Sequence, residues 1–151
     1  MKYLLVGFAG LLLAGAVMAD HHASIEAEVR DTVTAFNAAY AENRVDDYFS
    51  YYADDAVVYF YGARQDLDAY YAEWKEMAAA GGAVEKNDMS DLRIQVMPGG
   101  DVAVASYFVD YRFRSPQGDI STAKAFESEV WRKSDGAWKI VHLHYSEFAA
   151  E

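Results

Sequence analysis

The fold of this chain is decided near its end, by the stretch that reads VWRKSDGAWKIVHLHYS from Val130 to Ser146. Two runs of apolar, β-branched and aromatic residues flank Asp135 and Gly136. Asp-Gly between such runs is a strong hairpin signal, because a tight hairpin turn needs residues that tolerate a positive φ. Trp131 and Trp138 stand on the two arms. The stretch therefore predicts two antiparallel strands whose large aromatic side chains form one wall of a core.

Working outward from the hairpin, the remaining chain reads as helices first and strands afterwards. Apolar residues at helical spacing predict helices over Ser24–Ala41, with Ser24 as N-cap, near Val45–Tyr52, and over Asp66–Ala80. Strands are expected at Ala56–Tyr61, Leu92–Met97, Val102–Arg114, Ile120–Lys133 and Ala137–Phe148. This order predicts an α+β fold in which a strongly curved antiparallel sheet wraps around the N-terminal helices.

The N-terminus has the layout of a secretory signal peptide. Lys2 supplies a positive charge, Leu4–Ala14 is apolar, and Val17-Met18-Ala19 offers a cleavage site before Asp20. We expect a signal peptide over residues 1–19, one mature domain over residues 20–151, and a secreted or periplasmic location. An uncleaved N-terminal anchor is the alternative, although the apolar run is short for a membrane span.

Composition excludes several classes of function. The chain has 13 basic and 24 acidic residues, a net charge of −11, which disfavours binding to nucleic acid and, after signal cleavage, to anionic membranes. It has no cysteine, which excludes disulfides, thiolate metal sites and thiol enzymes. The Gly-x-Ser-x-Gly motif of serine hydrolases is absent, and Pro98-Gly99-Gly100 reads as a turn between strands rather than as a phosphate loop. We expect no cofactor.

The order of residues in the hairpin resembles the last two strands of the nuclear-transport-factor-2-like (SnoaL-like) superfamily, and in particular the association domain of calcium/calmodulin-dependent protein kinase II. The resemblance extends over almost the whole mature chain and implies a cone with an internal pocket. The superfamily hosts isomerases, dehydratases, polyketide cyclases, binding domains and oligomerisation modules, so the fold leaves function open. The matching positions are Tyr107, Gln117, Gly118, Thr122, Glu127, Val130, Trp131, Asp135, Gly136, Trp138, Lys139, Val141, His142, His144 and Ser146.

The same resemblance implies a change in the chemistry of the pocket. The association domain lines its pocket with arginines that hold a carboxylate-bearing ligand, and those positions correspond here to Val109, Glu129 and Tyr145. A histidine of the third helix corresponds to Asp68. A pocket that has exchanged these basic groups for carboxylates is expected to prefer a small neutral or cationic molecule.

Strand alternation supports an acidic, aromatic pocket. Glu127 and Glu129 share one face of their strand, and Tyr107, Val109 and Tyr111 share one face of the neighbouring strand. A carboxyl group among aromatic side chains has a raised pKa, which suits acid–base chemistry near neutral pH. On this interpretation Glu129→Gln weakens the binding of amines. Alternatively, Glu127 is a structural hydrogen-bond acceptor and Glu129 reaches water at the mouth of the cone.

The candidate site contains two kinds of residue. Asp68 and Glu129 are the candidate catalytic residues, whereas Tyr48 and Tyr59 are expected at the pocket wall because the resemblance places the short helix and the first strand there. The ligand-binding set comprises Tyr48, Tyr59, Asp68, Trp74, Tyr107, Val109, Tyr111, Glu127, Glu129 and Tyr145.

His142 and His144 lie two residues apart on a predicted strand and therefore project from one face. A zinc site needs three or four ligands, and the sequence offers no further ligand in register, so no metal is expected. These histidines are instead predicted on the outer face of the sheet. Together with Phe108, Phe126 and Val130 they would form the surface of a homodimer.

Two classes of function remain. The first is an exported small-molecule-binding or dimerisation module. The second is a cofactor-free isomerase, dehydratase or cyclase resembling ketosteroid isomerases or polyketide cyclases, in which Asp68 or Glu129 is the general base and a tyrosine is the proton donor. The sequence lacks the clear Tyr/Asp or His/Asp pairing of those enzymes, which favours the binding module.

Overall fold

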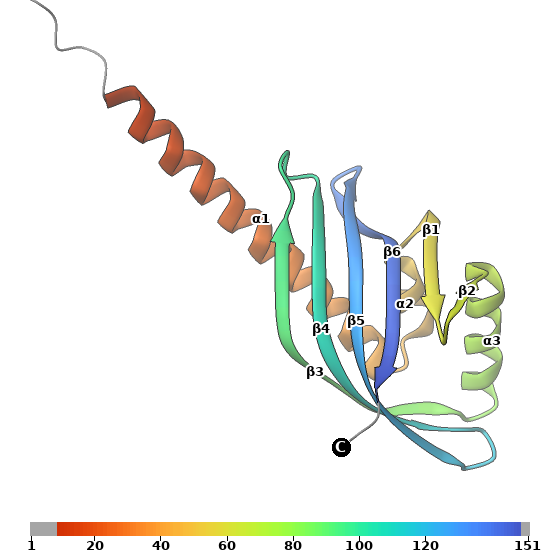
Figure 1. Cartoon of the computed structure of the whole chain (residues 1–151). Coiled ribbons are helices and arrows are strands. Elements are labelled where there is room, and N and C mark those ends of the chain that lie inside the picture. Colours follow the sequence, from red (N-terminus) through yellow and green to blue (C-terminus); the bar gives the residue numbers. More distant parts are fainter. Residues whose placement is uncertain (1–8, 149–151) are drawn as a thin grey trace, which may run out of the picture.

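The computed structural model of the chain describes the backbone of residues 9–148 and the side chains of residues 21–148. The expected signal peptide includes residues 1–8, which lie outside the described residues. Among the described residues, no helix combines the length and apolar character of a membrane span. The elements are α1 Ala9–Ala41, α2 Val45–Ser50, β1 Tyr52–Phe60, β2 Ala63–Gln65, α3 Leu67–Ala79, β3 Ala83–Val96, β4 Val102–Arg114, β5 Ile120–Ser134 and β6 Ala137–Phe148 (Figure 1).

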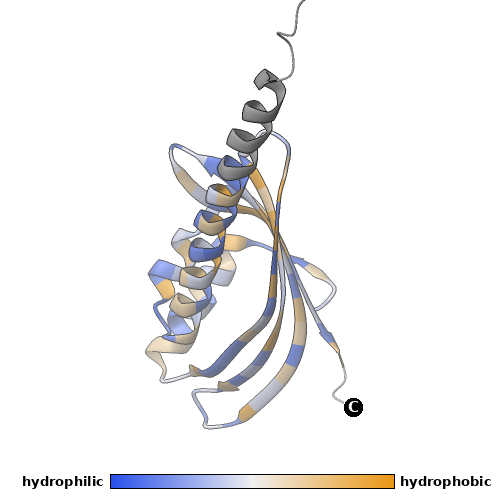
Figure 2. Ribbon diagram, turned by 90° about the vertical axis from the view of Figure 1, so that its left-hand side faces the viewer, coloured by the Kyte–Doolittle hydropathy of each residue, from blue (hydrophilic) through white to orange (hydrophobic). Residues whose placement is uncertain are grey.

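The predicted α+β fold with a curved sheet is confirmed. The six strands have the order β2-β1-β6-β5-β4-β3, and every neighbouring pair is antiparallel except β1 and β6, which are parallel. Figure 2 shows the long strands bending so that α1 runs along their concave side. The core lies between this concave face and the helices.

The first helix is longer than its sequence pattern predicts. Ile25, Val29, Val33 and Phe36 recur at helical spacing and are buried against the sheet, as expected. However, α1 already begins at Ala9, so Ser24 lies inside the helix and the prediction that it is the N-cap is wrong. The preceding residues are rich in Ala and Leu, which are good helix formers, and they therefore continue the helix toward the N-terminus.

The predicted hairpin is confirmed. Asp135 and Gly136 have φ angles of 52° and 82°, and this pair of left-handed residues makes the tight turn between β5 and β6. Trp131 is completely buried and Trp138 nearly so. The arms of the hairpin therefore supply the core wall that the sequence predicts.

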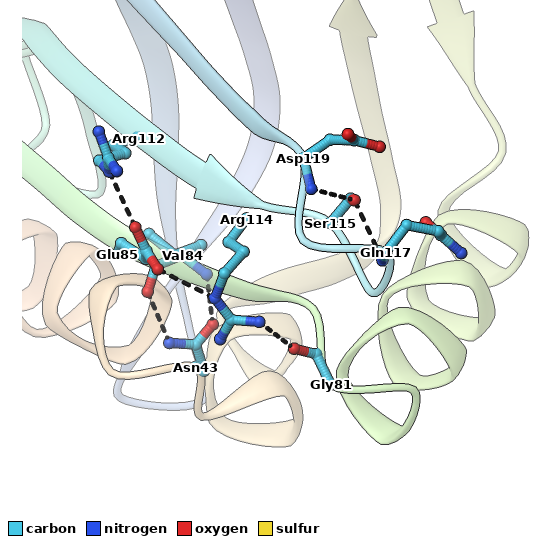
Figure 3. A network of polar contacts seen from close by, with 9 residues as sticks. All are labelled: Asn43, Gly81, Val84, Glu85, Arg112, Arg114, Ser115, Gln117 and Asp119. Carbon is cyan, nitrogen blue, oxygen red and sulfur yellow. Dashed lines mark hydrogen bonds and ion pairs between the residues drawn. The ribbon is translucent and has the colours of Figure 1, made fainter.

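Strand β3 begins at Ala83, nine residues before the expected start at Leu92. The sequence of this early part does not show the alternation of a strand, and a contact with a distant residue stabilises it instead. Asn43, in the α1–α2 connection, receives a 2.7 Å hydrogen bond from the backbone N–H of Val84. Its amide group also donates a 2.9 Å hydrogen bond to the Val84 carbonyl (Figure 3). The Asn43 side chain thus takes the place of a neighbouring strand at the beginning of β3.

Ion pairs hold the same end of β3 against β4. Glu85 accepts hydrogen bonds from Arg112 at 2.8 Å and from Arg114 at 3.0 Å, and Arg114 also donates to the carbonyl of Gly81 (Figure 3). The early part of β3 is polar, so its sequence does not indicate a strand. It pairs with β4, which lies almost thirty residues further along the chain. The anchored β3 closes one side of the space beneath the helices.

Candidate functional site

A cavity of about 190 Å³ lies between the helices and the concave face of the sheet. It is smaller than the roughly 300 Å³ at the lower end of typical ligand pockets, so it suits a compact molecule. Its walls are mainly aromatic, with Glu127 and two asparagine amides as the polar groups besides tyrosine hydroxyls. The lining residues are Phe36, Asn37, Tyr40, Tyr48, Phe60, Tyr61, Tyr70, Trp74, Asn87, Val109, Tyr111, Glu127 and Tyr145.

Local periodicity turns these side chains inward. Tyr70 and Trp74 are four residues apart on α3 and therefore share one helix face. On the sheet, alternate residues of β4 line the cavity, and Glu127 of β5 pairs directly with Tyr145 of β6. The acidic group is thereby placed on the sheet wall, opposite aromatic residues from the helices.

Glu127 belongs to a buried hydrogen-bond network centred on the hydroxyl group of Tyr107. The hydroxyl oxygen of Tyr107 lies 2.8 Å from Oε1 of Glu127 and 2.7 Å from Oε1 of Glu129. Tyr107 pairs across the strands with Glu127, whereas Glu129 pairs with Ala105, whose small side chain leaves room for the carboxyl group. Two carboxyl groups therefore meet at a single phenol oxygen.

The network ends in groups whose hydrogen-bonding roles are fixed. The Asn37 amide nitrogen donates to Tyr107 at 3.0 Å and to the carbonyl of Val33 at 3.1 Å, and its oxygen accepts from Asn87 at 3.0 Å. At the other end, the indole N–H of Trp131 donates to Oε2 of Glu129 at 2.7 Å. Among the described residues, no cationic side chain donates a hydrogen bond to either carboxyl group.

Burial without a cationic partner governs the ionisation of these groups. Desolvation raises the pKa of Glu127 to about 7, against the hydrogen bond from Tyr107, which lowers it. Desolvation, together with the nearby Glu127 charge, raises the pKa of Glu129 well above its usual value. Burial also raises the pKa values of Tyr107, Tyr40 and Tyr48. These three phenols therefore remain neutral near pH 7.

Most of the sequence-predicted ligand set meets in the cavity. Six of its ten members line the wall: Tyr48, Trp74, Val109, Tyr111, Glu127 and Tyr145. Tyr107 lies directly behind the wall, bonded to Glu127. The resemblance and the strand alternation therefore located the pocket and most of its aromatic lining.

Asp68 and Tyr59 lie elsewhere, contrary to expectation. Asp68 is exposed on α3 and borders a second, more open depression, because it is two residues from Tyr70 and so faces the opposite side of the helix. Tyr59 lies between the inward-facing Val58 and Phe60, and strand alternation turns it to the outer face, where its ring is 5.9 Å from that of His142.

Glu129 is also placed differently from either expectation. It is completely buried, so it neither reaches water at the mouth of the cone nor lines the cavity. Ala105 and Trp131 surround its carboxyl group, while Glu127, one step along the same face, reaches the open space. Strand alternation cannot distinguish these two residues, because their positions differ only along the strand.

Sequence reasoning missed the polar residues Asn37 and Asn87 of the cavity. Asn37 follows Val33 by four residues, so a polar residue on the buried stripe of the helix was an available signal. Asn87 lies in the part of β3 whose sequence does not read as a strand. Tyr40 and Tyr70 recur at helical spacing with apolar neighbours, and this spacing does not distinguish a cavity wall from a packed core.

His142 and His144 project from the outer face of β6, as predicted. Within residues 21–148, no three His, Asp or Glu side chains converge as a metal ion would require. On the same face Phe108 and Phe126 are 40% and 39% exposed, and Phe108 contacts both Phe126 and Phe148 edge to face.

Comparison with known proteins agrees with this architecture. The family model of the SnoaL-like domain matches residues 29–151. The chain belongs to the SnoaL-like domain family. No curated protein matches the sequence.

Several solved structures share the SnoaL-like fold of this chain. The hub homology domain of calcium/calmodulin-dependent protein kinase II from Chlamydomonas reinhardtii is 25% identical, with a TM-score of 0.66 over 82% of this chain and 98% of that domain. The association domain of the C. elegans kinase is 18% identical, with a TM-score of 0.66 over 84% and 98%. A nuclear-transport-factor-2-like protein from Cytophaga hutchinsonii is 18% identical, with a TM-score of 0.65 over 79% and 98%. These similarities establish the fold. They do not identify a ligand, which has to be inferred from the chemistry of the cavity.

Proposed function

We propose that this SnoaL-like domain binds one small neutral or cationic molecule in its aromatic cavity. The observation that carries the proposal is the position of Glu127, a carboxyl group at the wall of a partly enclosed cavity lined by nine aromatic side chains. Among the described residues, no Lys, Arg or His lines this space. An anionic guest would meet like charge in a medium of low dielectric constant, whereas an ammonium group would pair with Glu127 and lie among aromatic faces.

The charge preference can be tested with three probes of nearly equal shape. Phenethylamine is cationic, phenethyl alcohol is neutral and phenylacetate is anionic. The amine and the alcohol are expected to raise the melting temperature, and phenylacetate is expected to leave it unchanged. Stabilisation by phenylacetate alone would contradict the proposal, as would the absence of binding by all three probes in calorimetry.

One observation also favours a second candidate, acid–base catalysis on the bound molecule. The pKa of Glu127 is raised to about 7, where a carboxylate is an effective general base. Its test is the exchange of deuterium from heavy water into the carbon next to a carbonyl group of a small aromatic ketone. Exchange that depends on Glu127 would support an enzyme, and binding without exchange would support a binding protein.

We further propose that the domain forms a homodimer through the outer face of its sheet. Phe108, Phe126 and Phe148 form an exposed aromatic cluster there, which a monomer would leave in contact with water. The names of two structural neighbours, a hub homology domain and an association domain, are in keeping with self-association.

Export is part of the same proposal and rests on the sequence of residues 1–19. The mature protein recovered from a secreted or periplasmic fraction is expected to begin at or near Asp20. N-terminal sequencing checks this, and an intact Met1 or Lys2 in the soluble fraction would be evidence against cleavage.

A further inference from the structure

The hydrogen bonds around Tyr107 allow the protons of the buried network to be counted. A phenol has one proton to donate and two lone pairs that accept. The hydroxyl oxygen has three polar neighbours: Asn37 at 3.0 Å, Glu127 at 2.8 Å and Glu129 at 2.7 Å. Asn37 donates, and the Tyr107 proton satisfies one carboxylate. The remaining close contact needs a second donor, which only a protonated carboxyl group can supply.

The direction of the Asn37 amide is fixed independently. Its nitrogen lies 3.1 Å from the carbonyl oxygen of Val33, which can only accept, and its oxygen accepts from Asn87. Exchanging the amide oxygen and nitrogen would place two acceptors face to face. Asn37 therefore donates to Tyr107, and the need for one protonated carboxyl group follows.

The surroundings decide which carboxyl group holds that proton. Glu129 is completely buried, and its Oε2 already accepts from the Trp131 indole, so its Oε1 is the atom free to carry a proton toward Tyr107. Glu127 faces the cavity, where a ligand or water can stabilise a negative charge. Tyr107 then accepts from Glu129 and donates to Glu127.

We propose that Glu129 is a permanently protonated positioning residue, and this inference rests on the proposed function. Through Tyr107, Glu129 leaves Glu127 as the single ionised group of the cavity. The cavity therefore selects a ligand with one positive charge. A ligand with two ammonium groups would bring a second charge into an aromatic cavity whose wall offers one carboxylate. The ligand class is therefore a compact aromatic or alkyl monoamine.

This arrangement couples the binding of an amine to one proton. Besides Glu129, the polar groups that face Glu127 are the neutral phenols and amides of the cavity. They are Asn37 and Tyr40 of α1, Tyr48 of α2, Tyr61 of the β1–β2 turn, Tyr70 of α3, Asn87 of β3, Tyr107 and Tyr111 of β4 and Tyr145 of β6. None of these changes charge near pH 7 in the folded protein. Only Glu127 does, with its pKa raised to about 7 by burial, so an ammonium ligand releases its proton when it binds below that pH.

The test compares two isosteric variants with phenethylamine as the probe. In Glu129→Gln, the new amide donates to Tyr107 while its oxygen accepts from Trp131. Because Glu129 does not line the cavity, affinity is expected to stay within about twofold, in contrast to the loss of amine binding expected from the sequence. In Glu127→Gln, the charge partner is lost and affinity is expected to fall at least about thirtyfold. Calorimetry of the wild type in buffers of different ionisation enthalpy is expected to show release of almost one proton at about pH 6 and almost none at about pH 8.

A second readout does not depend on binding. Infrared spectra of the wild type at about pH 8 are expected to contain the C=O stretch of a protonated carboxylic acid, which Glu129→Gln removes and Glu127→Gln retains. If Glu129→Gln lost affinity for phenethylamine, or if the wild type lacked the infrared band, the inference would be overturned. The proposed function would still stand as long as the wild type bound the amine. If no probe binds, the proposed function is wrong, while the infrared band still decides the protonation of Glu129.

Discussion

The indole nitrogen of Trp131 donates a 2.7 Å hydrogen bond to Oε2 of Glu129, two residues away on the same strand, and both side chains are completely buried. Residues i and i+2 of a strand face the same side, so the pairing is local in the sequence. This local contact also affects groups that are distant in the sequence. Because Trp131 occupies Oε2 of Glu129, the other carboxyl oxygen, Oε1, is directed toward Tyr107, which lies next to the cavity.

Removing the central hydroxyl is expected to destabilise the protein. Tyr107→Phe leaves Asn37 and both carboxyl groups without their common partner, and a buried polar group that loses its partner costs about 1–3 kcal/mol. Urea denaturation measures the difference. Tyr61→Phe is the control, because Tyr61 is 74% exposed and its hydroxyl should contribute less than about 0.5 kcal/mol. Equal effects of the two changes would show that the network does not stabilise the fold.

The stability of the ligand-free protein is expected to depend on pH through Glu127. Its pKa is about 7 in the folded protein and 4.5 when unperturbed, so the folded state binds the extra proton between these values. The contribution of Glu127 is fully present below about pH 4.5 and is lost as the pH rises through about 7. Melting temperatures of the wild type and Glu127→Gln should therefore diverge over this window, with the wild type declining more steeply. Parallel pH profiles would contradict the raised pKa.

The side chain of Asn43 is expected to stabilise the start of β3 beyond its effect on the turn. Asn43 has a φ of 58° and makes two hydrogen bonds to the backbone of Val84. Asn43→Ala loses both bonds and strains the left-handed backbone, for a loss of about 2–3 kcal/mol. Asn43→Gly removes the same bonds without that strain, so its smaller loss in chemical denaturation isolates the hydrogen bonds. A Gly variant as stable as the wild type would show that these bonds contribute nothing.

A charge in the outer aromatic cluster is expected to separate the proposed homodimer. Phe126→Lys places an ammonium group beside Phe108, where burial against a second copy would desolvate it. Light scattering at micromolar concentration should report a dimer mass for the wild type and a monomer mass for the variant. Ala69→Lys adds the same charge on the exposed side of α3 and should leave the dimer intact. A monomeric wild type would refute this interface.

The sequence alone determined the elements whose signals are local. The Asp135–Gly136 turn, the full lengths of β4 and β6 and the buried stripe of α1 follow from turn chemistry and periodicity, which neighbouring residues establish among themselves. The aromatic pocket was predictable for the same reason, with the family resemblance supplying the cone.

Only the tertiary structure decided where β3 begins and which glutamate faces the ligand. The early part of β3 is a strand because Asn43 and the distant β4 satisfy its backbone. Glu127 and Glu129 are equivalent by strand alternation, but Glu129 lies opposite Ala105 and beside Trp131, while Glu127 lies opposite Tyr107 at the open space. Burial and proton sharing depend on groups brought together from α1, β3, β4 and β5, and no local pattern encodes such a meeting.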